Sequence, residues 1–266
     1  YLILPQTAEE IADVVKLCRQ EEIPWYIVGN GSNLLVADEG VRGVVIQLLR
    51  NFNQIQVEGC QIRMQAGAQN AAVAKRALDA SLTGFEFAAG IPGTIGGAVV
   101  MNAGAYGGEM KDILKEVTVL DQNGMIRTIP AEELELGYRT SIIARKGYVV
   151  LEAVIVLKTG DPKEIKAAID DLKEKRVTKQ PLEYPSAGST FKRPEGYFAG
   201  KLIMDAGLRG FSVGGAQISE KHCGFVINKG NATAKDVTEL MDETKKIVME
   251  KFGVALEPEV KRLGQF

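Results

Sequence analysis

Hydrophobic residues in the first part of the chain recur with the spacings of helices and strands in alternation. A helix is predicted over 7–20, because Thr7 and Glu10 have the spacing of a capping box and apolar residues follow on one helical face. Short apolar runs come next and indicate strands at 25–28, 34–36 and 43–48. The expected order is therefore helix, strand, glycine-containing loop and strand.

A second helix and a hairpin follow before residue 158. The apolar positions of this helix are Val73, Ala74, Ala77 and Leu78. The pair Asn123-Gly124 favours a tight hairpin turn, because both residues tolerate a positive φ. The strands and the hairpin that we expect here lie at 61–66, 116–130 and 148–157.

Beyond a domain boundary that we place near residue 158, the pattern changes to longer helices and few strands. Asp161 and Pro162 are typical of a helix start, and the helix that follows has its apolar face at Ile165, Ala168, Ile169 and Leu172. The other elements expected are a loop at 179–196, a short helix that ends at Gly207, strands within 211–227, a helix at 234–252 that ends at Gly253, and a tail strand.

The composition limits the kinds of binding partner and the cellular compartment that the chain can have. A chain of 266 residues with 45% hydrophobic content can bury a core, and 32 basic against 34 acidic residues with no basic block exclude a nucleic-acid partner. Three cysteines without a CxxC pair predict neither a disulfide framework nor a metal site, and no apolar run reaches the roughly 18 residues of a membrane span. We expect a cytoplasmic monomer without a signal peptide, whose natural start precedes Tyr1.

The stretch GIPGTIGGAVVMNAGAYGG, residues 90–108, holds seven glycines among aliphatic side chains. A flexible linker would be polar, whereas Ile91, Ile95, Val99, Val100 and Met101 are residues that proteins bury. This stretch therefore predicts bare backbone that lies against a partner.

The earlier loop GNGSNL, residues 29–34, has two interpretations. A Rossmann loop runs into a helix and has a third glycine, but here strand-like residues follow. The loop is then either a plain turn or a nest of backbone N–H groups that binds an anion, with Asn30, Ser32 and Asn33 as further donors.

Five motifs follow one another along the chain: GNGSNLLV (29–36), GIPGTIGGAVVMNAGAYGGE (90–109), GYRTS (137–141), PSAGSTFKRP (185–194) and EPEV (257–260). In this order they resemble the UDP-N-acetylenolpyruvoylglucosamine reductases, flavoenzymes of bacterial peptidoglycan synthesis. The resemblance covers essentially the whole chain. It implies an α+β fold in which a two-subdomain FAD-binding fold of the vanillyl-alcohol-oxidase type precedes a C-terminal α+β substrate domain.

From the resemblance we expect an FAD-binding domain at 1–158, with subdomains at about 1–50 and 51–158, a substrate domain at 159–254, and a tail strand at 255–266 that returns to the active site. The FAD is expected to be noncovalent. The residues expected to hold it are Gly29, Asn30, Gly31, Ser32, Asn33, Leu34, Gly90, Ile91, Pro92, Gly93, Gly96, Gly97, Ala98, Asn102, Ala103, Gly104 and Tyr106.

The resemblance also implies the reaction, the NADPH-dependent reduction of an enolpyruvyl ether to a lactyl ether. Hydride goes to the vinyl carbon and a proton goes to the neighbouring carbon, so the carboxylate must be polarised and a proton donor placed. Arg139, Ser189 and Glu259 match the family's catalytic positions, with Ser189 as the proton donor. Their ordinary alternatives are a surface ion pair, a turn residue and a solvated carboxylate, and Glu257 is a rival of its neighbour.

The substrate-binding residues expected from the resemblance are Tyr138, Arg176, Lys192, Arg193, Lys221 and His222. The arginines and Lys192 would neutralise the substrate diphosphate, unless their loop merely lies in solvent. A catalytic role for the lone histidine is disfavoured. No third glycine fingerprint is left for a dinucleotide, so we expect NADPH to share the substrate cleft and the kinetics to be ping-pong.

The chain departs from the family pattern in two places. The usual N-terminal segment with a Gly-Gly pair is absent, and almost no sequence separates GYRTS from the strand at 148–157. The chain thus resembles the compact branch without the insertion that carries a substrate-covering tyrosine, and we assign that role to neither Tyr148 nor Tyr184. Two alternatives stay open: an FAD oxidase of the same fold that acts on a hydroxy acid or sugar, and a nucleotide-binding protein without activity.

Overall fold

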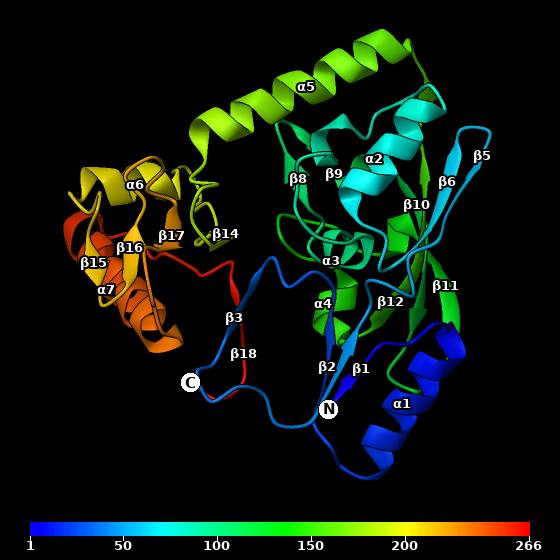
Figure 1. Cartoon of the computed structure of the whole chain (residues 1–266), viewed down its shortest axis with the longest axis horizontal. Coiled ribbons are helices and arrows are strands. Elements are labelled where there is room, and N and C mark those ends of the chain that lie inside the picture. Colours follow the sequence, from blue (N-terminus) through cyan, green and yellow to red (C-terminus); the bar gives the residue numbers. More distant parts are fainter. The chain divides into compact units, whose positions relative to one another are not determined.

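The computed structural model describes all residues, 1–266, and forms two compact units. The first unit comprises Tyr1–Gly31 and Gly43–Lys175, and the second comprises Ser32–Arg42 and Arg176–Phe266 (Figure 1). The chain thus enters the second unit once early and again near residue 176, whereas we expected one boundary near 158. As functional domains, the ranges given above stay a prediction.

The first unit contains a small parallel sheet in the order β1-β4-β2, made of β1 (Leu2–Ile3), β4 (Val44–Gln47) and β2 (Trp25–Val28). Helix α1 (Ala8–Gln20) joins β1 to β2, and its N-terminus is capped by Thr7, whose Oγ1 accepts the N–H of Glu10 at 3.1 Å. The Glu10 carboxylate accepts the N–H of Gln6 and not that of Thr7, so the predicted capping box is only half formed.

The first unit also holds an antiparallel sheet in the order β11-β10-β12-β6-β5. Its strands are β5 (Ile55–Glu58), β6 (Gln61–Gln65), β10 (Leu114–Leu120), β11 (Ile126–Pro130) and β12 (Val149–Val156). The predicted hairpin is confirmed, because Asp121 Oδ1 accepts the N–H groups of Asn123 and Met125 and Gly124 has φ 78°.

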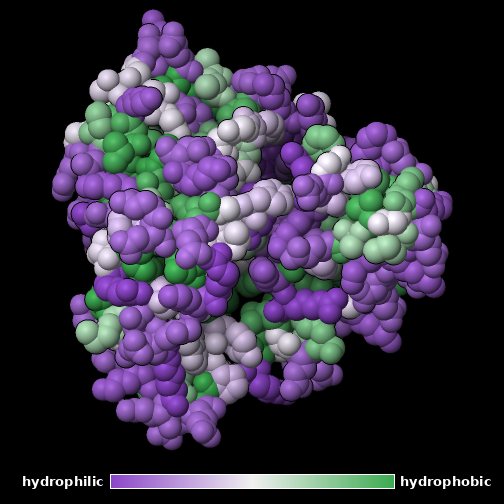
Figure 2. Space-filling view, turned by 180° about the vertical axis from the view of Figure 1, so that it is seen from behind, coloured by the Kyte–Doolittle hydropathy of each residue, from purple (hydrophilic) through white to green (hydrophobic).

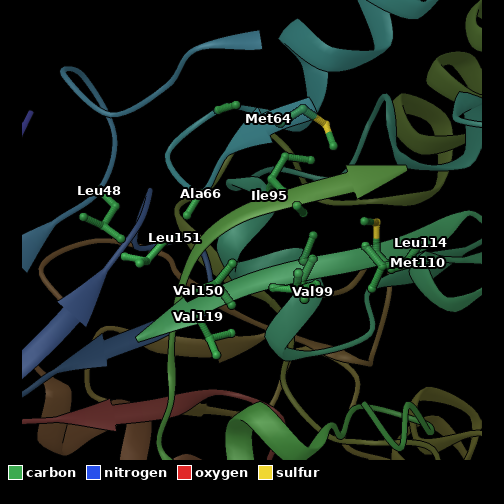
Figure 3. Close-up of a cluster of buried hydrophobic side chains, with 14 of the residues drawn as sticks. Leu48, Met64, Ala66, Ile95, Val99, Met110, Leu114, Val119, Val150 and Leu151 are labelled. Atoms are coloured by element: carbon green, nitrogen blue, oxygen red, sulfur yellow. The ribbon is translucent and has the colours of Figure 1, made fainter. Parts of the chain in front are cut away.

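One part of the hydrophobic core of the first unit lies between this sheet and helix α3 (Ile95–Val100), which the glycine-rich stretch forms, and the same core includes Ile11 and Val15 of α1. Ile95 and Val99 are completely buried and lie among Met64, Val119 and Val150 (Figure 3). The aliphatic residues of the stretch therefore pack inward, as their pattern predicts, while its glycines leave the backbone accessible. The other elements of this unit are α2 (Asn70–Asp79), β7 (Leu82–Thr83), β8 (Gly104–Ala105), β9 (Gly108–Glu109), α4 (Ile142–Lys146) and β13 (Lys158–Thr159), with 3-10 turns at Glu86–Ala88, Met110–Asp112 and Ala131–Glu133.

Helix α5 (Pro162–Lys179) begins at the predicted proline, but its predicted apolar face is not a buried face. Ile165 alone is buried, Ala168 is exposed, and Ile169 and Leu172 are half-buried. The helix is instead sustained by exposed pairs between residues four apart, such as Lys166–Asp170 and Lys175–Asp171.

The second unit is a four-stranded antiparallel sheet with two helices. The sheet has the order β14-β17-β16-β15, and its elements are β14 (Ser186–Ser189), β15 (Ser212–Val213), β16 (Ala216–Ile218), β17 (Phe225–Asn228), α6 (Ala199–Asp205) and α7 (Ala234–Phe252). Gly253 ends α7 with φ 67°, as predicted. The tail strand β18 (Lys261–Leu263) pairs in parallel with β3 (Leu34–Val36), which Figure 1 shows as a red arrow beside a blue one.

The surface is mostly polar. Figure 2 shows hydrophilic residues over most of one face, with hydrophobic residues in small separate patches. No helix of the structure combines the length and the apolar character needed to cross a bilayer.

Candidate active site

The first glycine loop follows β2 and presents backbone donors. Gly31 has φ 69°, and a Cβ there would meet no atom within 4 Å, so the backbone at this point faces open space. The N–H groups of Asn30 and Gly31 have no acceptor within the chain. Asn33, further along the loop, donates its Nδ2 to the carbonyl oxygen of Glu259 at 3.2 Å and accepts the N–H of Lys261, so it holds the tail.

The structure brings the two glycine loops into contact within the first unit. A Cβ on Gly29 would lie 2.4 Å from the Oγ1 of Thr94, which is buried just before α3. The carbonyl oxygen of Gly29 accepts a hydrogen bond from Gln47 Nε2 at 3.4 Å. Only glycine permits this approach, so the first loop lies directly against the second.

The second glycine loop is anchored to the core by its own backbone. The N–H groups of Ile95 and Gly96 donate to the carbonyl oxygens of Ala68 and Ala66, each at 2.8 Å. The next N–H, that of Gly97, has no acceptor within the chain. Asn70 holds the start of the loop through Nδ2, which donates to the Ile91 carbonyl at 3.2 Å, and its buried Oδ1 has no partner.

These two loops have the features that an FAD requires. Three N–H groups without internal acceptors, on Asn30, Gly31 and Gly97, are suited to an anionic diphosphate. The bare backbone lets a flat ring approach closely, and the buried aliphatic residues behind it keep that backbone in place. The residues present therefore fit the cofactor, and loops 29–31 and 93–97 would hold it.

The contact between Gly29 and Thr94 can be tested directly. We expect Gly29→Ala to lower the FAD affinity by about 10- to 100-fold, because an inserted methyl typically costs about 1–3 kcal/mol and here would push the loops apart. Thr94→Ala in the same chain should restore most of the affinity, because it removes the Oγ1 and the Cγ2 that the new methyl would meet. Fluorescence titration of apoprotein with FAD measures both. Gly230→Ala, where a Cβ would meet no atom within 4 Å and the backbone is not left-handed, is the control, and an unchanged affinity in Gly29→Ala would refute the contact.

Arg139 lies at the tip of a tight turn in the first unit. Gly137 and Thr140 exchange both backbone hydrogen bonds, at 3.1 and 3.3 Å, so Tyr138 and Arg139 are the two turn residues. Arg139 has φ 53°, its guanidinium carbon lies 5.0 Å from the centre of the half-exposed Tyr138 ring, and its Nη2 donates to the Gly104 carbonyl at 3.3 Å. The turn thus presents a cation on a short, well-held segment.

Other residues predicted to bind the cofactor have mainly local roles. Tyr106, at φ 54°, is an exposed residue of the turn between β8 and β9, and the Ala103 N–H donates to the Ala98 carbonyl at 2.7 Å. Asn102 is completely buried, and both its amide hydrogens and its carbonyl oxygen have protein partners. Its side chain therefore has no donor left for a cofactor.

Ser189 and Glu259 come together in the second unit. Ser189 ends β14 as an exposed residue, and the next residue, Thr190, accepts the N–H of Glu259 at 2.8 Å. The rival carboxylate, that of Glu257, is 69% exposed and forms an ion pair with Lys192. The structure thus gives Glu257 a partner of its own and puts the backbone of Glu259 beside the strand that carries Ser189.

Several residues predicted to bind the substrate have partners in the second unit. Lys221 Nζ donates to the Val177 carbonyl at 2.8 Å and lies 3.6 Å from Glu183, and the Arg193 guanidinium lies 4.5 Å above the Phe198 ring. Arg176 is half-buried near the end of α5. These contacts hold the basic groups in place without a ligand.

His222 is held as a neutral side chain. Its Nδ1 accepts the N–H of Gly224 at 3.0 Å, and its ring meets that of Phe225 edge-on. Burial lowers the pKa of the imidazole, so the ring is uncharged at neutral pH with its proton on Nε2, an assignment that follows from the bond at Nδ1. This environment suits a hydrogen-bond donor better than a general acid.

The sequence interpretation missed two supporting residues, Gln47 and Asn70, which have no motif of their own and act through one contact each to a glycine loop. Thr94 lies within the quoted stretch 90–108 but was not singled out, because its closeness to Gly29 arises only in the fold. Ser141 was quoted only as part of GYRTS, yet it is buried, donates to the Val100 carbonyl at 2.8 Å and caps α4. Its place ahead of two isoleucines was a readable capping signal.

Comparison with known proteins agrees with this geometry. Residues 1–130 match the model of an FAD-binding domain, and residues 180–263 match that of the C-terminal domain of UDP-N-acetylenolpyruvoylglucosamine reductase. The UDP-N-acetylenolpyruvoylglucosamine reductase of Lachnoclostridium phytofermentans is 55% identical over 100% of this chain and 87% of its own length. That of Clostridium perfringens is 56% identical over 99% of this chain and 86% of its own length.

A solved structure, the UDP-N-acetylenolpyruvylglucosamine reductase of Thermus caldophilus, superimposes with a TM-score of 0.84 at 38% identity. The match covers 98% of this chain and 91% of that one. The expected α+β fold, an FAD-binding domain followed by a C-terminal domain, is confirmed by these matches. The chain belongs to the UDP-N-acetylenolpyruvoylglucosamine reductase family.

Proposed function

We propose that this chain reduces UDP-N-acetylglucosamine enolpyruvate to UDP-N-acetylmuramate in peptidoglycan synthesis, with NADPH as the electron donor and noncovalent FAD as the cofactor. The observation that carries the proposal is the identity of 55% over the whole chain to a reductase of this name. FAD held by loops 29–31 and 93–97 would supply the redox chemistry that moves hydride from NADPH to the vinyl carbon of the substrate. The alternative of an oxidase with covalent flavin is not favoured.

In this proposal, the chain's own residues handle the carboxylate and the proton. The Arg139 guanidinium and the Glu259 carboxyl group hold and polarise the substrate carboxylate, which gains negative charge when hydride reaches the vinyl carbon. The Ser189 hydroxyl then gives its proton to the neighbouring carbon. The fixed turn of Arg139, and the pairing of Thr190 with Glu259 next to Ser189, support these roles.

In this proposal, three basic residues neutralise the substrate diphosphate: Arg176, Lys192 and Arg193. Lys192 must then exchange the Glu257 carboxylate for a phosphate. Lys221, His222 and Tyr138 line the remainder of the substrate site, and His222 contributes its Nε2 proton as a donor. NADPH uses the same cleft and leaves before the substrate enters, which gives ping-pong kinetics.

We place the reaction in the cytoplasm and the protein there as a monomer. All three cysteines are free, as a reducing compartment allows. Sedimentation equilibrium checks the oligomeric state.

An anaerobic titration tests the function. Protein that holds FAD is reduced with one equivalent of NADPH and then titrated with the enolpyruvyl sugar nucleotide, and the flavin absorbance should return in proportion to the substrate added. The lactyl product is identified by mass spectrometry. Flavin that stays reduced in the presence of excess substrate would refute the proposed reaction, whereas reduction of the oxidised flavin by a hydroxy acid or a sugar would favour the oxidase.

The mode of flavin attachment has a separate test. Acid precipitation should leave all the yellow colour in the supernatant, because neither glycine loop contains a histidine or cysteine that could bond to the flavin ring. Absorbance of the supernatant and of the redissolved pellet measures the split. Colour that stays with the pellet would show a covalent bond.

A further inference from the structure

One buried asparagine joins the second glycine loop to the turn that carries Arg139. Asn102 follows α3 and is completely buried, with φ 41°. Its Nδ2 donates to Glu109 Oε2 at 2.6 Å and to the Gly137 carbonyl oxygen at 3.1 Å, and its Oδ1 accepts the N–H of Lys111 at 2.9 Å. One amide therefore connects three segments that lie apart in the sequence.

The turn depends on that contact because its conformation is unusual for its residues. The Gly137 carbonyl oxygen that Asn102 binds also accepts the N–H of Thr140, and this bond closes the turn. Arg139 has φ 53°, in the left-handed region that residues with a Cβ rarely occupy. Surrounding contacts must hold such a residue in place.

The second support of Arg139 depends on the same asparagine. The guanidinium donates to the carbonyl oxygen of Gly104, which pairs with Glu109 in the β8–β9 hairpin. Because Asn102 binds the Glu109 carboxylate, it fixes the hairpin as well as the turn. The turn that carries Arg139 and the Gly104 carbonyl that its guanidinium binds are thus held by the same amide.

We propose that Asn102 is a positioning residue for Arg139, and that it sets the place of the guanidinium relative to the glycine-rich stretch 90–108 in which this asparagine lies. This inference rests on the proposed function, in which Arg139 holds the substrate carboxylate. The Asn102 side chain is occupied by protein partners, and the expectation that this residue helps to hold the FAD stays a prediction.

The chemistry requires an amide at this position. The Nδ2 faces a carboxylate and a carbonyl, both acceptors, while the Oδ1 faces a backbone N–H. Lys111 Nζ pairs with Glu109 Oε1, and this bond raises the pKa of the ammonium, so the carboxylate keeps its charge partner. Aspartate would have the same size and keep the acceptor, but it would put a second carboxylate where a donor is needed.

The first experiment uses the protein without FAD and reads the turn directly. Asn102→Gly keeps the left-handed backbone and removes all three hydrogen bonds, and Asn102→Asp removes the donors alone. Trypsin should cut after Arg139 at least about tenfold faster in both variants than in wild type, because the released turn becomes extended. Mass spectrometry identifies the fragment that ends at Arg139. Equal cleavage rates in the variants and the wild type would overturn the proposal.

The control is Thr244→Val, which removes a buried hydrogen bond to the Leu240 carbonyl within α7 of the second unit. It should lower stability without exposing the bond after Arg139. If either Asn102 variant fails to fold by circular dichroism, Glu109→Ala removes one of the three partners of the asparagine and should accelerate the cleavage in the same direction by a smaller factor. Accelerated cleavage in Thr244→Val as well would show general loosening and would count against the proposal.

The second experiment uses the holoenzyme and a double-mutant cycle. Reoxidation of reduced flavin by the enolpyruvyl substrate should slow about tenfold in Asn102→Gly, while reduction by NADPH changes less than about twofold. In protein that already carries Arg139→Ala, Asn102→Gly should not slow reoxidation further, because the side chain that Asn102 positions is already absent. Full additivity of the two effects would overturn the proposal. If wild-type flavin is not reoxidised at all, the proposed function fails, and the proteolysis result still stands by itself.

A pH profile separates positioning from simple loss of structure. In Asn102→Asp, the new carboxylate faces Glu109, with Lys111, Asp112 and Arg139 as the other charged groups on adjoining segments. Burial beside the Glu109 carboxylate disfavours a negative charge on the new aspartate, so lowering the pH favours its protonated form, whose O–H restores one donor. Reoxidation in this variant should therefore recover relative to wild type as the pH falls. Asn102→Gly should show no such recovery, and a flat ratio in Asn102→Asp would contradict the donor requirement.

Discussion

Ser189→Ala should slow the reoxidation of reduced flavin by the enolpyruvyl substrate at least about a hundredfold and leave flavin reduction by NADPH nearly unchanged. General acid catalysis contributes about 10²–10⁴-fold, so its loss raises the barrier by roughly 3–5 kcal/mol. Hydride transfer from NADPH needs no such donor. Stopped-flow absorbance of the two half-reactions, each followed at the flavin band, measures the split.

The matched control is Ser186→Ala, at the other end of β14 and likewise exposed. It should leave both half-reactions unchanged. Ser189→Cys should recover part of the lost rate, because a thiol can also donate a proton to carbon. If Ser189→Ala reoxidises at nearly the wild-type rate, another group is the donor, and Glu259 is the first candidate because its backbone pairs beside β14.

The elements that could be predicted from the sequence are those with a local signal. Thr7 and Gly253 mark the ends of α1 and α7, and Asn123-Gly124 marks a hairpin, since each acts through its own backbone or cap. Strand β5 and helix α4 also had local signals, an alternating IQVE and a serine cap, and were overlooked. Local propensity was sufficient wherever a cap or turn residue was present.

The elements that could not be predicted depend on distant partners. Helix α3 has the sequence IGGAVV, which propensity disfavours, but its first N–H groups bond to Ala66 and Ala68 beyond β6. Strand β1 has two residues and exists through its pairing with β4. Helix α5 has the apolar spacing of a packed helix, yet its neighbours do not cover that face. Tertiary contacts decided each of these cases.

The residues of the candidate site also fall into those that the sequence indicates and those that only the fold brings together. The glycine loops were identified by composition, because only bare backbone can approach as closely as Gly29 approaches Thr94. Arg139, Ser189 and Glu259 came from family motifs, since nothing in their spacing indicates a common function. The role of Asn102 has no signature in the sequence, because it arises from three contacts that only the folded chain brings together.

Arg139→Ala should slow reoxidation by the enolpyruvyl substrate by about 10²–10³-fold, the usual loss when one preorganised donor to a developing negative charge is removed. Flavin reduction by NADPH should change little, because that half-reaction does not involve the substrate carboxylate. FAD should still bind, because the free N–H groups of Asn30, Gly31 and Gly97 are unchanged. The reoxidation rate of Arg139→Lys should lie between those of wild type and Arg139→Ala, because lysine keeps the charge but lacks the planar guanidinium that matches a carboxylate. The same stopped-flow half-reactions provide the measurement.

Arg127→Ala is the matched control for this change. Its guanidinium also lies over a tyrosine ring, at 5.3 Å from the centre of Tyr148, and it is exposed on β11. Loss of that stacked arginine should leave both half-reactions intact, so a cation stacked on tyrosine is not in itself enough for the effect. Adding guanidinium ion to Arg139→Ala should recover part of the reoxidation rate, because the missing group is then supplied from solution. A reoxidation rate for Arg139→Ala within about threefold of wild type would show that the arginine has no role in the reaction. Asn102 would then have no catalytic group to position.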